Sequence, residues 1–103
     1  MNATQTTHET LTQLATLILV DVAAARATCT SWRRWNDLNG SCVQRIAQEL
    51  GCSVDAVAMP ARHALDMLVQ HGLVEVNCGY GANVRLTQAG QAVASRCNDT
   101  INA

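Results

Sequence analysis

The segment from residue 41 to residue 87 constrains the fold of this chain more than any other part of it. Ser41 opens an amphipathic segment whose apolar residues recur at helical spacing as far as Leu50. After a Gly-Cys-Ser turn at residues 51–53, a second helical segment runs to residue 71, and two short apolar strands follow within residues 73–87. The pattern therefore predicts a helix, a turn, a second helix and a β-hairpin.

Capping residues mark the ends of these segments. Ser41 and Gln44 match the Ser-x-x-Gln capping box, and Gly51 is suited to end the first helix. Ser53 is placed to cap the second helix, and Thr87 to cap a last helix over residues 88–97, after which we expect a frayed tail.

The first part of the chain predicts a long helix over residues 7–28, with Thr6 as its cap and Glu9 as the third residue of a capping box. One apolar stripe of this helix consists of Leu11, Leu14, Ala15, Ile18, Val22 and Ala25. Leu17 and Val20 add a second apolar edge, which either widens the core face or packs against a second copy of the chain.

Three motifs resemble parts of bacterial winged-helix regulators. Ile46-Ala47-x-x-Leu50-Gly51-x-Ser53-x-x-x-Val57 resembles their first two helices. Arg62-x-Ala64-Leu65-x-x-Leu68-x-x-x-Gly72-Leu73-Val74 is similar to the end of the recognition helix in GntR-like and MarR-like families. Val84-x-Leu86-Thr87-x-x-Gly90 is similar to the strand and helix start that follow the wing in MarR-like and PadR-like regulators.

The resemblance implies a winged helix-turn-helix domain, mainly α with a small β-hairpin, that occupies residues 1–103 as one domain. Its helix-turn-helix would span residues 41–71 and its wing residues 73–87. It also implies a sequence-specific transcriptional regulator that binds double-stranded DNA. The long apolar first helix, which is longer than such a domain requires, predicts a homodimer that forms through this helix and the last helix.

One departure from the family pattern concerns the recognition element. Residues 58–61, Ala-Met-Pro-Ala, insert about one helical turn compared with the GntR-like spacing. Proline lacks a backbone donor and disfavours helix at the preceding residue, here Met59. Either a short helix over residues 53–58 precedes a separate helix that starts at Pro60, or one long helix is kinked there.

The resemblance also nominates DNA-contacting residues. Near the major groove it implies Ser53, Asp55, Ala56, Arg62 and His63, all from the recognition element. Tyr80 and Arg85 are the candidate wing contacts to a minor groove or phosphate, although Tyr80 is equally explained as an exposed loop aromatic.

Charge gives DNA binding little general support. The chain has seven arginines, no lysine, eight acidic residues and a net charge of -1, whereas non-specific DNA affinity comes mainly from cations that neutralise phosphates. Local charge is more favourable, because Arg33, Arg34 and Arg45 lie in a stretch with few acids, and these three arginines are further candidates for DNA contact. The segment around Trp32 and Trp35 predicts a short helical turn with both rings on one side, which either fill the core or stack on bases.

Other functions have weaker support. The five cysteines contain no C-x-x-C pair, so no zinc site, other metal site or disulfide framework is indicated, and we expect no cofactor. Buried cysteines would act as small hydrophobes, and no enzyme constellation is present. The apolar run of residues 14–20 is too short for a membrane span. The odd number of cysteines, without a disulfide framework, favours a reducing cytoplasm as the expected location. The alternative function is a winged-helix protein-interaction module, from a mobile element or phage, that binds a protein through the same surface.

Overall fold

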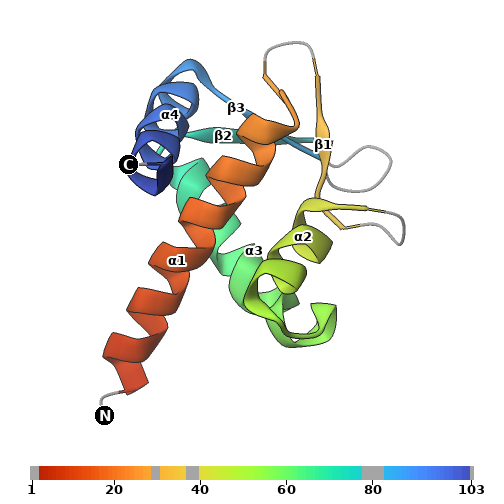
Figure 1. Cartoon of the computed structure of the whole chain (residues 1–103), viewed down its shortest axis with the longest axis vertical. Helices are drawn as coiled ribbons and strands as arrows, with labels where there is room; N and C mark the ends of the chain where they lie inside the picture. Colours follow the sequence, from red (N-terminus) through yellow and green to blue (C-terminus); the bar gives the residue numbers. More distant parts are fainter. Residues whose placement is uncertain (1–2, 29–30, 37–39, 78–82, 103) are drawn as a thin grey trace.

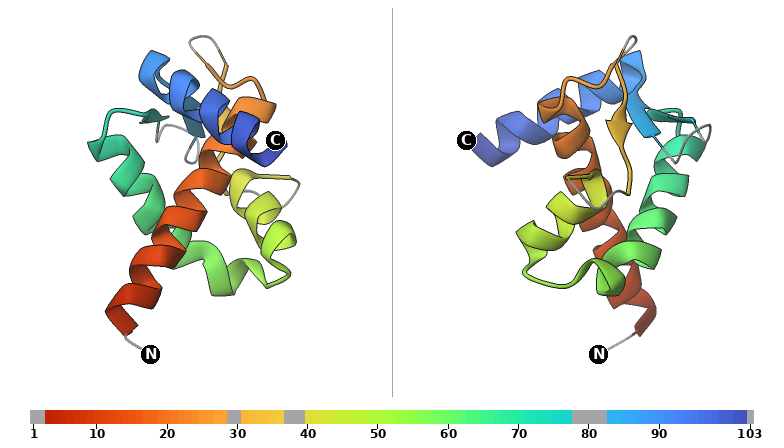
Figure 2. Two further views of the ribbon diagram at one scale, coloured as in Figure 1. Left: turned by 60° about the vertical axis from the view of Figure 1, so that its left-hand side comes forward. Right: turned by 90° about the vertical axis from the view of Figure 1, so that its right-hand side faces the viewer.

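The computed structural model describes residues 3–28, 31–36, 40–77 and 83–102 of the chain, which form a mainly helical domain with a small antiparallel sheet (Figure 1). The elements follow one another as α1 (Ala3–Ala24), β1 (Arg33–Arg34), α2 (Cys42–Leu50), α3 (Val54–Gln70), β2 (Val74–Asn77), β3 (Asn83–Leu86) and α4 (Gln88–Asn102). Helix α1 runs through the centre of the molecule, and α2, α3 and α4 all pack against it (Figures 1 and 2).

The core lies where α1 meets the other helices and the inner face of the sheet. Its largest fully buried apolar side chains come from α1, α2, α3 and β3, namely Leu14, Ile18, Val22, Val43, Ile46, Leu65 and Val84. Burial of a side chain of this size contributes roughly 1.5–3 kcal/mol to the free energy of folding. Of the stripe predicted for the first helix, Leu14, Ala15, Ile18 and Val22 are buried in the core, whereas Ala25 is exposed just beyond the end of α1.

Helix α1 is displaced toward the N-terminus relative to the predicted range of residues 7–28. It begins at Ala3, so Thr6 lies inside the helix and does not cap it. It ends at Ala24, because Arg26 adopts a left-handed conformation with a φ of 56°. The Arg26 N–H donates to the Ala23 carbonyl, and the Ala27 N–H donates to the Val22 carbonyl. These two bonds are those of a Schellman motif, in which the left-handed position is usually a glycine.

The caps of the middle helices agree with the sequence prediction. The side chain of Ser41 accepts a hydrogen bond from the Gln44 N–H at the start of α2, and that of Ser53 accepts one from the Ala56 N–H at the start of α3. Gly51 ends α2 with a φ of 67°. The local signals therefore set both ends of α2 and the start of α3.

Helix α3 is one continuous helix of 17 residues with Pro60 inside it, which decides between the two possibilities left by the sequence. Figure 2 shows that the helix changes direction after its first turns, as expected of a helix that contains a proline. Val57 and Ala61, on either side of Pro60, are both buried. Tertiary packing on both sides of the proline thus compensates for the hydrogen bond that it removes.

The sheet has three strands in the order β1-β3-β2. The predicted hairpin is confirmed: β2 and β3 pair antiparallel, with Glu75 opposite Arg85 and Val76 opposite Val84. The residues between Trp32 and Trp35 form β1 rather than the predicted helical turn, because Arg33 and Arg34 pair with the free edge of β3. In an extended strand residues three apart lie on opposite sides, and accordingly Trp35 is buried in the core while Trp32 is 37% exposed.

Helix α4 begins as predicted and is longer than predicted. The Thr87 hydroxyl accepts a hydrogen bond from the Gly90 N–H and donates one to the Gly72 carbonyl, so the cap of α4 is attached to the end of α3. The backbone of α4 continues to Asn102, where a frayed tail was expected from residue 98.

Candidate nucleic-acid interface

Helix α3 and its N-cap present half of the residues that the sequence nominated for DNA contact. Ser53, Asp55, Ala56, Arg62 and His63 are all exposed at or after its N-terminus. The exposed face also includes Met59, which is 73% exposed, and Asp66. Because Asp55, Met59, Arg62 and Asp66 recur at spacings of three and four residues, they form one line along the helix. The structure therefore brings five of the ten nominated residues together on one element.

The arginines of α2, α3 and the β2–β3 hairpin are paired with carboxylates. Arg62 Nε lies 3.3 Å from Asp66 Oδ1 and Arg45 Nε lies 3.2 Å from Glu49 Oε1, in both cases across one helical turn. Residues 42–77 and 83–86 carry three arginines against four carboxylates: Arg45, Arg62 and Arg85, and Glu49, Asp55, Asp66 and Glu75. This part of the surface is thus not electropositive.

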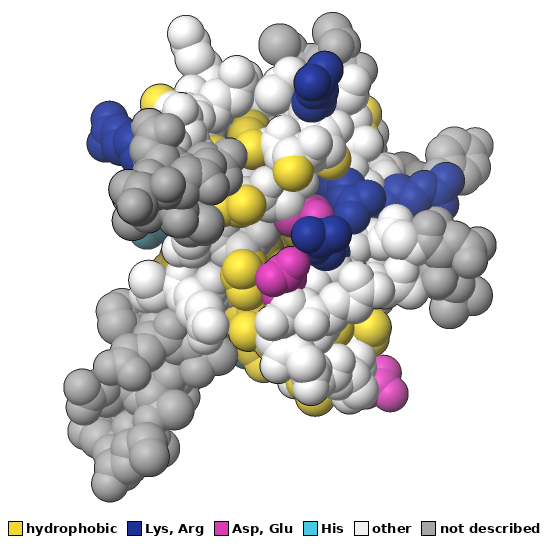
Figure 3. All heavy atoms as spheres, in the orientation of Figure 1, with side chains coloured by type: hydrophobic (Ala, Val, Ile, Leu, Met, Phe, Trp, Pro, Cys, Tyr) yellow, Lys and Arg dark blue, Asp and Glu magenta, His cyan; other side chains and the backbone are white. Residues whose placement is uncertain are grey.

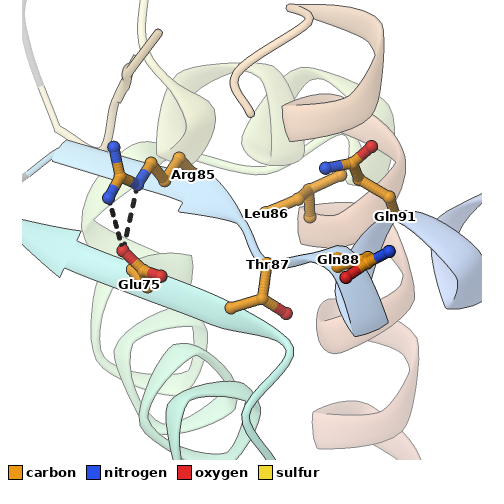
Figure 4. A pocket seen from close by; sticks show the side chains of 6 residues that line it. All are labelled: Glu75, Arg85, Leu86, Thr87, Gln88 and Gln91. Atoms are coloured by element: carbon orange, nitrogen blue, oxygen red, sulfur yellow. Dashed lines mark hydrogen bonds and ion pairs between the residues drawn. The ribbon is translucent and has the colours of Figure 1, made fainter. Parts of the chain in front are cut away.

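Arg85 lies on the sheet face that is turned away from α1 and α3 (Figure 4). Its Nη2 is 2.7 Å from Glu75 Oε2, and the Nε also donates to that oxygen at 3.0 Å. The guanidinium carbon is 4.3 Å from the centre of the Trp32 ring, within the range of a cation–π contact. A shallow pocket of about 460 Å³ lies beside this cluster and is lined by Glu75, Arg85, Leu86, Thr87, Gln88 and Gln91.

Arg33 and Arg45 lie on a different surface. The guanidinium of Arg33 donates to both carboxylate oxygens of Asp21 in α1, at 3.0 and 3.4 Å, and Asp21 is only 11% exposed. Together with Arg45 and Glu49 these residues border a groove between α1 and α2. Figure 3 shows positively and negatively charged side chains gathered beside a strip of hydrophobic side chains. The groove contains no residue of α3, so the two arginines are separated from the candidate recognition surface.

The remaining nominated residues have different positions. Arg34 is exposed on β1, where it is opposite Asn83 of β3, so it is close to Arg85 in the sheet and not to α3. Tyr80 lies outside the described residues. Sequence reasoning did not single out Asp66, although its four-residue spacing from Arg62 signals an ion pair. It also missed the Arg85 partners Glu75 and Trp32, which only the strand register reveals.

The cysteines and histidines do not form a site in the part of the chain that the structure describes. There, no three His, Cys, Asp or Glu side chains are close enough to hold a metal ion. Cys42 is fully buried, as expected for a small hydrophobe, whereas Cys52 is exposed. Burial, together with the charge of Asp21 and a hydrogen bond to it, raises the pKa of the Cys42 thiol far above its ordinary value. This thiol is therefore protonated and unreactive at neutral pH. His63 and His71 are both exposed.

No protein-family model matches the chain, and no curated protein or solved structure is significantly similar to it. Among the described residues, none of the helices combines the length and apolar character needed to cross a membrane.

Proposed function

We propose that this chain is a winged helix-turn-helix protein that reads duplex DNA with α3. The observation that carries the proposal is the order of elements, in which β1 precedes α2 and α3 and pairs with the hairpin strand β3 at the edge opposite β2. This arrangement agrees with the family resemblance in residues 46–90, which came from the sequence alone. Fold does not by itself establish activity, so the support must also come from the presentation of α3.

The geometry of α3 suits a recognition helix. Its N-terminal turns carry short exposed side chains at Ser53, Asp55 and Ala56, which allow close approach to base edges. Its 17 residues correspond to a length of roughly 25 Å, and an α-helix fits the major groove of B-DNA. Arg62 lies two turns further along the same face and is the best candidate for a forked contact to guanine.

The paired arginines determine how such binding would depend on salt. An exposed ion pair is worth up to about 1 kcal/mol, so a phosphate can take over Arg62 or Arg85 at small cost. The released carboxylate nevertheless remains near the phosphate and opposes it. We therefore expect few effective phosphate contacts and a slope of log K against log salt of roughly -1 to -2 per protomer, with specificity that comes from bases.

The test is selection of duplexes from a random library at low salt, followed by polarisation measurements on the enriched sequence. Arg62→Ala should weaken binding by about 1–3 kcal/mol and relax the sequence preference. Arg85→Ala should cause a smaller, salt-dependent loss on all sequences alike. Arg96→Ala is the matched control, because Arg96 is also an exposed arginine on a helix but belongs to α4, outside α3, the hairpin and the α1/α2 groove. Folded Arg62→Ala that binds as tightly as the parent chain would refute α3 as the reading element.

One observation favours a second candidate function, docking onto a protein. Met59 is 73% exposed at the centre of the α3 face, and Val69 near the end of the same helix is 41% exposed. Exposed apolar side chains on a helix with no excess of positive charge are typical of protein interfaces more than of DNA interfaces. If no duplex is enriched and random duplex fails to bind at low salt, this second function replaces the first.

A further inference from the structure

We propose that the groove between α1 and α2 is the binding surface for a second copy of this chain. The groove has a volume of about 500 Å³ and is separate from α3. Its apolar lining comes mainly from one side of α1, where Leu17 and Val20 are half-buried and Ala24 and Ala25 are exposed, with Ile46 contributed by α2. The proposal does not rest on DNA binding, because nothing in the groove belongs to the recognition helix.

The charges around the groove indicate what occupies it. The Arg33–Asp21 and Arg45–Glu49 pairs border it, so it carries two positive and two negative side chains. A partner with an excess of either sign gains nothing from this balanced border. A second copy, which carries the same balanced border, is electrostatically complementary to it.

The positions of Arg45 and Glu49 suit a two-fold axis. A symmetric interface requires that a residue on one copy meets a different residue on the other, and that the reverse contact forms as well. Arg45 and Glu49 are one helical turn apart on α2, and their side chains are 60% and 50% exposed. Each arginine can therefore exchange its own glutamate for that of the second copy, and the exchange costs little because an exposed pair contributes little to folding.

The shape of α1 allows a close approach. Ala24 and Ala25 are small, so a second backbone can lie near α1 without a clash between side chains. A copy seated in the groove therefore meets only small side chains at residues 24 and 25.

The experiment measures the mass of the parent chain and four variants by sedimentation without DNA, from submicromolar to submillimolar concentration. The parent should change from the monomer mass of 11.0 kDa to twice that mass as concentration rises. Glu49→Arg places like charges across the axis and should raise the dimer dissociation constant at least about tenfold. The double variant Arg45→Glu with Glu49→Arg restores a balanced pair and should recover dimerisation.

Val20→Asp and Val69→Asp form the matched apolar pair. Val20→Asp places a charge inside the groove and should abolish the dimer, whereas Val69→Asp places the same charge on α3, outside the groove, and should leave it intact. Circular dichroism checks that each variant is folded. A parent chain that stays monomeric throughout, or a folded Glu49→Arg variant that dimerises like the parent, would overturn the proposal. So would a double variant that fails to regain the dimer. Because DNA is absent, none of these results depends on the proposed recognition function.

Discussion

Substitution of Gly90 by alanine should destabilise the protein, although alanine normally stabilises a helix relative to glycine. Gly90 is buried in the first turn of α4, against the backbone of Leu73 at the start of the hairpin. A Cβ atom built on Gly90 would lie 1.8 Å from the Leu73 carbonyl oxygen and 2.9 Å from its carbonyl carbon. Because both neighbours are backbone atoms, no side-chain rotation can relieve the clash.

The size of the stability loss can be worked out from the movement of α4 that would relieve the clash. An ordinary contact between carbon and a carbonyl oxygen is about 3.3 Å, so α4 must move away by more than about 1 Å. That movement stretches two hydrogen bonds of the parent protein. The Thr87 N–H donates to the Leu73 carbonyl at 3.1 Å, and the Thr87 hydroxyl donates to the Gly72 carbonyl at 2.6 Å. Loss of these bonds costs about 1 kcal/mol each, and overpacking adds about 1–3 kcal/mol. After a gain of about 1 kcal/mol from helix propensity, the net loss is about 2–4 kcal/mol.

Urea denaturation followed by far-ultraviolet circular dichroism measures this loss. Ala92→Gly is the matched control, because Ala92 is exposed in the same helix and its replacement loses only helix propensity, about 1 kcal/mol. Gly90→Ala should be the more destabilising of the two. A Gly90→Ala protein as stable as the parent, or more stable, would show that the close contact with Leu73 does not constrain the domain.

Four further predictions concern stability and reactivity. Arg26→Gly should raise the free energy of unfolding by about 1 kcal/mol in the same denaturation assay, because Arg26 occupies a left-handed position that glycine adopts without strain; a less stable variant would contradict this. Ser41→Ala should lower the free energy of unfolding by about 1–2 kcal/mol, since the Ser41 cap is fully buried. Ser53→Ala should lower it by less, because the Ser53 cap is exposed. Equal losses in the two variants would count against the role of burial. Under native conditions a thiol reagent should modify Cys52 and leave Cys42 unreacted, as judged by peptide mass mapping. Because the pKa of Cys42 is raised in the folded protein, the protonated thiol contributes fully to the free energy of unfolding at neutral pH, and this contribution declines as pH rises above about 8.5. Cys42→Ala should therefore reduce the loss of stability at alkaline pH.

The candidate site was predictable to the extent that it depends on one element. Five of the candidate residues lie in one helical segment, so their common exposure at α3 follows from helical periodicity. They are Ser53, Asp55, Ala56, Arg62 and His63. The separation of Arg33 and Arg45 from α3 was not predictable. It depends on how α1, β1 and α2 pack, and Asp21 is 12 residues away from Arg33 in sequence.

The formation of β1, which was not predicted, and the continuity of α3, which was one of the two possibilities left open, have a related cause. The residues of β1 have no strong strand pattern of their own, and they become a strand because β3 offers an unpaired edge beside them. Helix α3 continues through Pro60 because Val57 and Ala61 are both held in the core. In each case tertiary contacts outweighed the local conformational preference of the residues.

The sequence by itself determined the features whose physical cause is local. The caps at Ser41, Ser53 and Thr87 each bind a backbone N–H three residues further on, and the β2–β3 hairpin follows from alternation over a few residues. Only the tertiary structure decided which charges far apart in the sequence meet. Glu75 and Arg85 are ten residues apart along the chain and become partners through strand register, as the Asp21–Arg33 pair does through helix packing. Such pairs depend on how the helices and strands pack around the core, so they cannot be predicted from a short stretch of sequence.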